Sequence, residues 1–313
     1  MRFAAALAFA AVLSFPVFAQ VPQSTGSREP TLESYEPNMV GFTKDSDDDG
    51  FLDVKLSLIY PLMPKVMTAH FEDSQLYFAA TVRFAQYLGT RESSPVVGKR
   101  FNPKLIWREF TPRNRFFLDY VDFAYAHESN GQSITTPEEF AFEVQRQVAT
   151  GNRADAAKDF ISRGWDYLEV ATKHTPRRWS SNEDHGQLNI YTSFRYFVQE
   201  GLLQGKAEEY NAWENDPEGK PRKQVQGIAV FLKREKWWND RTRDLSGAKL
   251  GFGWETGYEK PLRYNTFRLE GRADVFELPL LLFYQNGYNS DLSQYYKRVS
   301  TIGIALELGT SRR

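Results

Sequence analysis

A histidine and a serine two positions apart could together perform acyl transfer. Residues 117–131 read FLDYVDFAYAHESNG, and apolar and polar residues alternate up to His127 and Ser129. On a β-strand, residues at positions i and i+2 point to the same side and lie next to each other. A serine nucleophile needs a base within hydrogen-bond reach, and the base needs a third group to orient it. The pair therefore predicts a nucleophile with its general base, although a His-x-Ser pair also occurs in strands by accident.

An aspartate in the next alternating segment could be that third group. Asp166 shares a face with Leu168 and Val170, and that face is the apolar one. In an antiparallel pair, the start of one strand lies beside the end of the strand before it, which brings Asp166 next to His127. A carboxylate and an imidazole on an apolar face are costly to desolvate unless they are paired. We therefore predict a site made of Ser129, His127 and Asp166.

Alternation with a period of two residues dominates the chain beyond residue 34. Bulky apolar residues keep to one face of each segment and charged residues to the other, as in residues 53–60 and 188–199. This period indicates β-strands with one apolar face. The alternating segments lie near 37–44, 52–61, 74–87, 101–110, 116–129, 165–173, 187–200, 223–234, 247–257, 262–271, 274–286 and 297–308. Twelve such strands would close a bacterial barrel, which uses an even number.

Two architectures produce this pattern. A soluble secreted sandwich turns the apolar face inward, whereas a membrane barrel turns it toward lipid. A Lys or Arg on the lipid face costs roughly 2–4 kcal/mol at the midplane, which explains why charges avoid that face. The opposite face carries small or polar residues such as Ser57, Asn189, Ser193, Gly303 and Ala305. Aromatic residues occur at segment ends, as a girdle at the membrane interface requires, namely Trp107, Tyr120, Trp165, Trp237, Trp238 and Tyr284. These features favour an all-β fold, a twelve-stranded antiparallel transmembrane β-barrel.

Composition excludes several other classes. The 313 residues include 39 Lys+Arg and 40 Asp+Glu, so a formal charge of −1 gives no attraction of the whole chain to nucleic acid. The absence of cysteine excludes disulfides, thiolate metal sites and a cysteine nucleophile. A mean hydropathy of −0.54 argues against a bundle of membrane helices.

The N-terminal region predicts export. Arg2 precedes an apolar run that ends in small residues at Ala19, which is typical of a secretory signal peptide over residues 1–19; an uncleaved membrane anchor is the alternative. Residues 20–34 are rich in Pro, Ser, Thr, Gly and Glu and indicate a loose N-terminal arm. Residues 35–313 form the predicted barrel domain, which has to be stable without disulfides.

Two motifs resemble those of the bacterial outer membrane phospholipase A family. Residues 125–131 read YAHESNG, where the family has a tyrosine followed by His-x-Ser-Asn-Gly. Residues 162–166 read SRGWD, where the family has Ser-Arg-x-Trp-Asn. Further similarity lies at residues 35–38, 54–58, 60–62, 92–95, 298–299 and 303–306, whereas residues 174–245 match poorly. The resemblance implies a twelve-stranded barrel of the bacterial outer membrane that hydrolyses acyl esters of phospholipids.

The same resemblance implies roles for individual residues. It makes Ser129 the nucleophile, His127 the general base and Asp166 the group that holds the imidazole tautomer, with the backbone N–H of Gly131 in the oxyanion hole. It also implies phospholipase A1 and A2 activity, which releases fatty acid and lysophospholipid, in a calcium-dependent homodimer.

The calcium ligands implied by the resemblance come from two subunits. They are the Ser93 hydroxyl of one subunit and the Gln132 carbonyl and Ser162 hydroxyl of the other. The loop over residues 130–162 is long and is expected to be extracellular, while the short turn near 111–115 is expected to be periplasmic. Counting strands back puts Ser93 on the extracellular side too, at the outer-leaflet interface.

The sequence departs from the family at two places. Asp166 stands where the family has asparagine, and the loop between the two motifs is longer. Within that loop, residues 137–160 have Phe140, Val144 and Val148 at helical spacing. We hypothesise a surface helix over the active site; an inert insertion is the alternative.

A separate acidic loop resembles the start of a calcium-binding loop. Residues 45–50 read DSDDDG and Asp53 follows, which matches the first nine positions of an EF-hand loop. Leu56 occupies the position of the bidentate glutamate. Calcium binding here is a hypothesis, and a solvated acidic loop tip is the alternative.

For the whole chain, the alternative function is a non-catalytic outer-membrane barrel, a channel or a structural protein, that retains the motif without the activity.

Overall fold

The computed structural model describes residues 32–47, 49–63, 73–89, 96–111, 118–176, 186–204, 219–237, 245–276 and 278–308. The predicted signal peptide and nearly all of the N-terminal arm lie outside these residues. The element bounds are β1 Asn38–Asp45, β2 Gly50–Pro61, β3 Ser74–Tyr87, β4 Val96–Phe110, β5 Tyr120–Ser129, α3 Pro137–Ala149, η2 Ala154–Phe160, β6 Gly164–His174, β7 Gln187–Val198, α4 Arg222–Val225, β8 Gly227–Trp237, β9 Leu245–Gly257, β10 Asn265–Val275, β11 Leu278–Gly287 and β12 Val299–Leu308.

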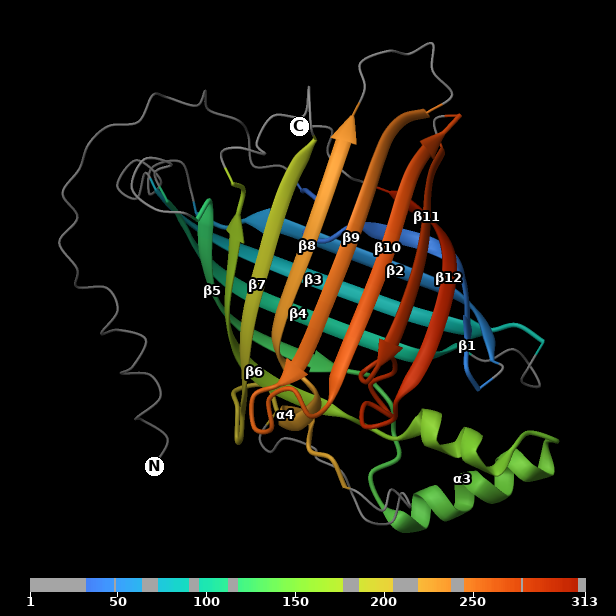
Figure 1. The fold of residues 1–313 in the computed structure, drawn as a ribbon. Coiled ribbons are helices and arrows are strands. Elements are labelled where there is room, and N and C mark those ends of the chain that lie inside the picture. Colours follow the sequence, from blue (N-terminus) through green and yellow to red (C-terminus); the bar gives the residue numbers. More distant parts are fainter. Residues whose placement is uncertain are drawn as a thin grey trace. The chain divides into compact units, whose positions relative to one another are not determined.

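The twelve strands form one closed antiparallel barrel (Figure 1). Each strand pairs with its neighbours along the chain, and β1 closes the barrel against β12, with Val40 opposite Leu306. The predicted twelve-stranded antiparallel barrel is confirmed. No helix among the described residues is long and apolar enough to cross a membrane.

The apolar face of each strand points out of the barrel. On β12, Ile302 is 62% exposed and Ile304 is also exposed, while the alternate residues Thr301, Ala305 and Glu307 are buried inside. The soluble sandwich is excluded, because a single closed sheet exposes the face that a sandwich would bury. An outward apolar surface with a polar interior is the pattern of a transmembrane barrel.

Buried ion pairs lie inside the barrel. Glu169 on β6 pairs with Lys104 on β4 at 2.5 Å and with Arg195 on β7 at 2.7 Å. A second buried pair joins Lys249 on β9 to Glu307 on β12, and strands β10 and β11 lie between these two strands. The sequence pattern predicted small and polar residues on the inner face; the structure differs in that long charged side chains also lie there and pair with one another.

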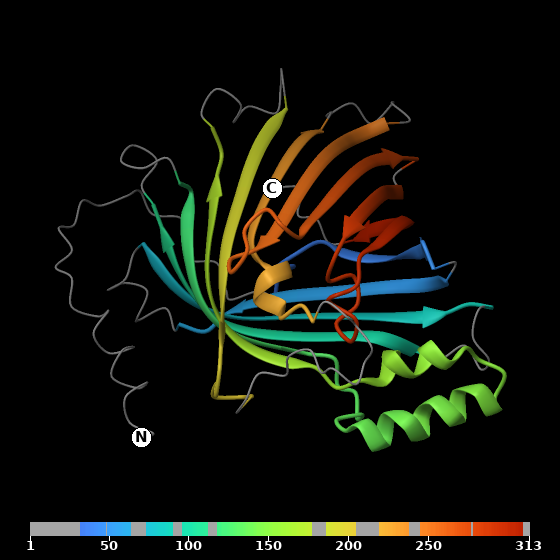
Figure 2. The ribbon, with the colours of Figure 1, turned by 60° about the horizontal axis from the view of Figure 1, so that its bottom comes forward.

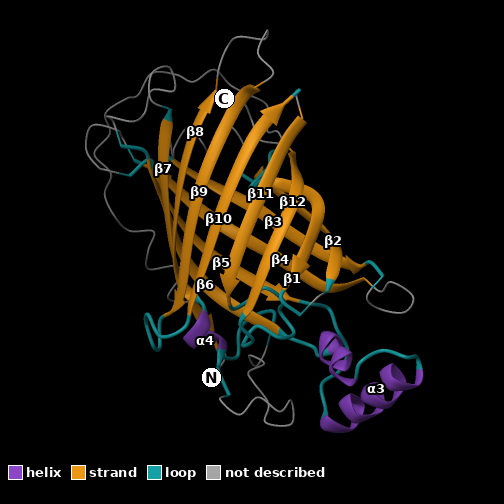
Figure 3. Ribbon diagram, turned by 45° about the vertical axis from the view of Figure 1, so that its right-hand side comes forward, coloured by secondary structure: helices purple, strands orange, loops and turns teal. Residues whose placement is uncertain are grey.

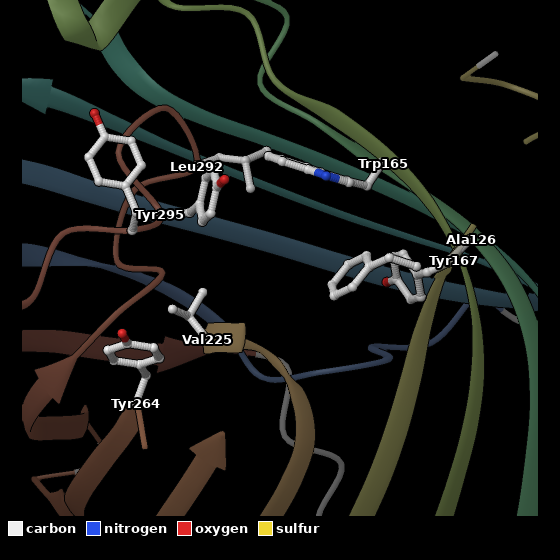
Figure 4. Packing of buried hydrophobic residues seen from close by; sticks show 9 residues of the cluster. Ala126, Trp165, Tyr167, Val225, Tyr264, Leu292 and Tyr295 are labelled. Atoms are coloured by element: carbon white, nitrogen blue, oxygen red, sulfur yellow. The ribbon is translucent and has the colours of Figure 1, made fainter. Parts of the chain in front are cut away.

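One end of the barrel is closed by aromatic packing. Figure 2 brings this end forward and shows α4 and the loop after β11 inside the ring of strand ends. The buried residues of this plug are Ala126, Trp165, Tyr167, Phe197, Val225, Tyr264, Leu292, Tyr295 and Tyr296 (Figure 4). Trp165, expected among the aromatic residues at the membrane interface, is instead fully buried, with its ring 5.2 Å from that of Tyr295.

The start of one predicted strand is wrong, because helix α4 occupies it. The alternating segment near 223–234 becomes strand only from Gly227, because Arg222 to Val225 form a single helical turn. This turn points the Arg222 guanidinium into the barrel, where it pairs with Glu128 and lies over the Trp165 ring at 4.5 Å. The helical turn buries both that ion pair and Val225, which favours it over an extended strand at these residues.

The long loop between β5 and β6 forms two helical pieces rather than one. Helix α3 begins with a capping box in which Thr136 accepts from the Glu139 N–H and the Glu139 carboxylate accepts from the Thr136 N–H. Hydrogen bonds from the backbone of Thr135 and Thr136 hold the pKa of Glu139 below its ordinary value, so this cap weakens as the pH falls through that pKa. The helix ends where Gly151 adopts a φ of +82°, and η2 follows.

The helical pieces lie at the plugged end, as Figure 3 shows for α3. Their contacts reach β3, β4 and the loop after β11. Tyr87 at the end of β3 and Gln294 in that loop donate to the Asp159 carboxylate, at 3.4 and 3.1 Å. Arg153 contacts the carbonyl of Asp47 in the β1–β2 turn. Among the described residues, none of these contacts involves the predicted catalytic groups, so they do not support a helix that covers the site.

We predict that breaking a buried ion pair lowers the free energy of unfolding much more than breaking a surface pair does. Glu169→Gln leaves the buried Lys104 and Arg195 without their shared carboxylate, and we expect the free energy of unfolding to fall by about 3–5 kcal/mol. Arg153→Ala breaks a surface pair with Asp155, which is half exposed, and should cost about 1 kcal/mol or less. Guanidinium unfolding in detergent measures both; equal effects would contradict the packing described for the interior.

Candidate active site

The two predicted motifs meet at the ends of neighbouring strands. Strands β5 and β6 pair antiparallel with His127 opposite Asp166 and Ser129 opposite Gly164. On β5, Ala126 and Glu128 are buried on the inner face, so His127 and Ser129 lie on the outer face. The structure therefore places the three residues on one outward surface, as the alternation predicted; their catalytic roles stay a prediction.

His127 is hydrogen bonded to Asp166. The distance between His127 Nδ1 and Asp166 Oδ1 is 2.7 Å, and the side chains are 16% and 0% exposed. An ionised carboxylate only accepts hydrogen bonds, so this contact assigns the imidazole proton to Nδ1. The lone pair of Nε2 then remains to accept a proton, as a general base requires.

Ser129 lies next to His127 along the strand but is not yet bonded to it. Among the described residues, no hydrogen bond joins the Ser129 hydroxyl to His127. Catalytic hydrogen bonds are often long or poorly aligned until substrate is bound. The structure thus brings together the base and its orienting carboxylate, and it positions the serine on the same face within one strand repeat.

The residue between the pair anchors the strand end from inside. Glu128 is buried and is held by Arg222 of α4 and by Arg100 of β4, whose Nε lies 3.4 Å from Glu128 Oε1. Because Glu128 is fixed inside the barrel, the side chains on either side of it are fixed outside. The sequence showed an inward acidic residue but not its distant partner Arg222.

Asn130 ties the two motif segments together beyond the strand ends. Its side chain donates to the Ile161 carbonyl at 2.7 Å and accepts from the Arg163 N–H at 2.9 Å. Gly131 follows with a φ of +61°, a left-handed conformation that favours glycine. The chain therefore turns sharply at the residue predicted to supply the oxyanion-hole N–H.

The predicted calcium ligands are partly described. Gln132 and Ser162 lie on the two segments that Asn130 and the bridge between Ile134 and Ile161 hold side by side. Ser93 lies outside the described residues. Among the residues that the structure describes, no group of three or more His, Cys, Asp or Glu could hold a metal ion.

The described carboxylates of the acidic loop after β1 do not converge on one point. The Asp45 carboxylate accepts from the backbone N–H groups of Asp47 and Asp49, at 2.9 and 3.0 Å. Asp53 points into the barrel and receives two hydrogen bonds from Arg83, at 2.8 and 2.6 Å. The structure does not support the hypothesis of an EF-hand-like calcium site here, because Asp53 lies on the wrong face.

Sequence reasoning missed a second set of contacts on Asp166. The hydroxyl of Tyr125 and the backbone N–H groups of Leu203 and Gln204 all donate to Asp166 Oδ2. Tyr125 shares the outward face with His127, which the alternation did show. Residues 201–204 follow β7 and carry no motif, so nothing in the sequence indicated that they reach the site.

Comparisons with known proteins agree with this fold. No protein-family model and no curated protein matches the chain. The barrel superposes on the outer membrane phospholipase A of Escherichia coli and on an active-site mutant of it, each with a TM-score of 0.61 and 18% identity, over 90% of this chain and 95% of that chain. The fold is that of outer membrane phospholipase A. The Salmonella typhi phospholipase, a dimer with bound calcium, gives a TM-score of 0.60 at 18% identity over 88% of this chain and 92% of that chain.

The resemblance inferred from the motifs is thus confirmed for the fold. The motifs and the superposition indicate the same barrel, and the two motif segments lie on paired strands. The chain has the fold of an outer-membrane barrel.

Asn130 provides a test of how the site is assembled. Asn130→Ala removes its hydrogen bonds to Ile161 and Arg163, and we expect amide exchange of Arg163 to accelerate by about tenfold or more while the barrel persists. The control Asn286→Ala removes an amide that contacts the side chains of Ser300 and Arg298 elsewhere on the barrel, and should leave that exchange unchanged. Unchanged exchange in both variants would contradict the role of Asn130.

Proposed function

We propose that this protein is a phospholipase A of the outer membrane, which hydrolyses acyl ester bonds of phospholipids with Ser129 as nucleophile. The observation that carries the proposal is the hydrogen bond between His127 and Asp166 on the outward face, one strand repeat from Ser129. The shared fold with outer membrane phospholipase A adds support. A nucleophile, a base and an orienting carboxylate are the parts that acyl transfer by serine needs.

The surroundings of the site suit a lipid substrate. Large apolar side chains near the three residues point out of the barrel, and Leu202 and Leu203 are 81% and 64% exposed. The site lies at the end that carries the long β5–β6 loop, and long loops are extracellular in such barrels. We therefore place the proposed reaction at the outer-leaflet interface, where phospholipid ester bonds lie.

The first half of the proposed reaction forms an acyl-enzyme. Ser129 Oγ attacks the ester carbonyl carbon while its proton passes to His127 Nε2, and Asp166 stabilises the resulting imidazolium. The Gly131 N–H donates to the oxyanion, and such a donor contributes roughly 2.7–4 kcal/mol to the transition state. The intermediate collapses as the bond to the glycerol oxygen breaks. That oxygen takes the proton from His127 and leaves as lysophospholipid.

The second half restores the enzyme. His127 removes a proton from a water molecule, whose oxygen attacks the acyl carbon bound to Ser129. Collapse releases the fatty acid, and Ser129 Oγ recovers a proton from His127. The same imidazole thus acts as base and then as acid in each half, which requires that Asp166 hold it in one orientation throughout.

A calcium ion fits the donor chemistry near the nucleophile. The Gln132 carbonyl and the Ser162 hydroxyl are neutral oxygen donors on adjacent segments, the type of ligand that calcium takes. We propose that they bind the ion together with Ser93 of a second subunit in an active homodimer. When bound there, the ion supplies positive charge beside the developing oxyanion.

The interior of the barrel does not favour the alternative of an open channel. Long charged side chains pair inside the barrel, and Trp165, Arg222 and Tyr295 pack at the plugged end. A water-filled channel needs an interior that side chains leave free.

Ser129→Ala tests the nucleophile. We expect kcat for fatty-acid release from detergent-dispersed phospholipid to fall by at least about 10⁴-fold, because no other group can form the acyl-enzyme. The refolded variant should keep the heat-modifiable migration of the closed barrel on unboiled gels. Equal release by both proteins would refute Ser129 as nucleophile, and no release by the folded wild type would favour the non-catalytic barrel.

Calcium removal tests the metal ligands. Chelator should lower hydrolysis by about 10²-fold or more and added Ca²⁺ should restore it, because one stabiliser of the oxyanion is lost and regained. Ser162→Ala should raise the calcium concentration for half-maximal activity by about tenfold. Asp45→Ala is the matched control, and it should leave that concentration unchanged; a shift with Asp45→Ala alone would move the calcium site to the acidic loop.

A further inference from the structure

The segment that follows strand β7 encloses Asp166. Strand β7 lies next to β6 with Val198 opposite Asp166, and residues 201–204, which follow β7, come within hydrogen-bond distance of the Asp166 carboxylate. We call these four residues the β7–β8 cover. Asp166 faces outward like Leu168 and Val170, which are exposed, yet its side chain is 0% exposed. The cover, together with Tyr125 and His127, therefore encloses this carboxylate.

Four donors converge on the two carboxylate oxygens. Oδ1 is bonded to His127, while Oδ2 accepts from the Tyr125 hydroxyl at 2.5 Å, the Leu203 N–H at 2.7 Å and the Gln204 N–H at 3.0 Å. The Tyr125 oxygen in turn accepts from the Leu202 N–H at 2.7 Å. An ionised carboxylate only accepts hydrogen bonds, and the three groups that contact Oδ2 are all donors.

The approach of the cover depends on Gly201. A Cβ atom at that position would lie 2.1 Å from Asp166 Oδ2, which no contact between real atoms allows. The backbone of the cover can therefore come within hydrogen-bond distance of the carboxylate only with glycine at residue 201. Glycine is required at residue 201 for steric reasons.

These donors distinguish a carboxylate from an amide. If an asparagine at residue 166 turned its oxygen toward His127, its NH₂ group would face the N–H groups of Leu203 and Gln204, donor against donor. If it turned its oxygen toward the cover, its NH₂ group would face His127 Nδ1. That nitrogen would then have to accept, and the imidazole proton would move to Nε2, where it blocks proton transfer from Ser129.

We infer that Tyr125 and the β7–β8 cover form a positioning site that is specific for an ionised carboxylate at residue 166 and thereby fixes the proton of His127 on Nδ1. The inference rests on the proposed function and deepens it. It also accounts for the aspartate that stands where the phospholipase A motif has asparagine. Tyr125 and Gly201 are positioning residues, because they act on the base through Asp166.

Two variants with matched controls test the positioning site by kinetics. Tyr125→Phe removes one donor, and we expect kcat to fall about tenfold with KM unchanged. Gly201→Ala displaces the cover, and we expect a fall of about 10²-fold. The controls are Tyr284→Phe on the outer face of β11 and Gly271→Ala on β10, where the added Cβ meets only ordinary contacts at 3.8 Å. Both controls should stay within about twofold of wild type.

The tautomer of His127 can be measured by NMR spectroscopy, which tests the inference independently of enzymatic activity. In protein labelled with ¹⁵N-histidine, the imidazole shifts identify the tautomer, and loss of one signal set in His127→Asn assigns them to His127. We expect a protonated Nδ1 in wild type and in both controls. In Asp166→Asn the proton should move to Nε2, with kcat lower by about 10³–10⁴-fold. Migration on unboiled gels shows which variants still form the barrel.

The possible outcomes separate this inference from the proposed function. Hydrolysis that needs Ser129 but is unaffected by Tyr125→Phe and Gly201→Ala, with unchanged His127 shifts, would overturn the positioning site and leave the function standing. An Asp166→Asn protein that keeps Nδ1 protonated would overturn it as well. If the wild type does not hydrolyse phospholipid, the function fails, and the His127 shifts in Asp166→Asn and Gly201→Ala still decide the inference.

Discussion

The hydrogen bond between His127 and Asp166 is the contact on which the rest of the site depends. It requires a carboxylate on the apolar outer face of the barrel, where an unpaired charge is costly. The register of β5 and β6 puts the partners opposite each other, and donors from Tyr125 and the β7–β8 cover saturate the remaining oxygen. Three neighbouring strands therefore cooperate to hold one imidazole.

The same division between inside and outside organises the whole barrel. Charged side chains point inward and pair with one another, as Glu169 does with Lys104 and Arg195. Glu128 extends this interior network to the end of β5, directly between His127 and Ser129. A site on the outer face is thus held from within, by a plug that also closes the barrel. The charged groups inside the barrel and the His127–Asp166 pair outside it are alike in that each group has a hydrogen-bonding partner.

Local alternation was enough to predict most of the fold from the sequence. It located β3 at residues 74–87 and the other strands to within a few residues, because period two is a property of neighbouring residues. It failed at residues 222–225 and at Trp165, where long-range packing in the plug decides the structure. In the site, adjacency of strands predicted that Asp166 meets His127. The contacts of Leu203 and Gln204 depend on how an irregular segment folds back, which no periodicity encodes.

Covalent labelling of the nucleophile tests the central claim most directly. The folded barrel, with calcium, is treated with a long-chain alkyl sulfonyl fluoride, and the modified residue is mapped by peptide mass spectrometry. The account predicts a single modified residue, Ser129, and loss of labelling in His127→Asn, because the serine is activated only through the imidazole. Labelling of another residue, or labelling of Ser129 at the same rate without His127, would contradict it.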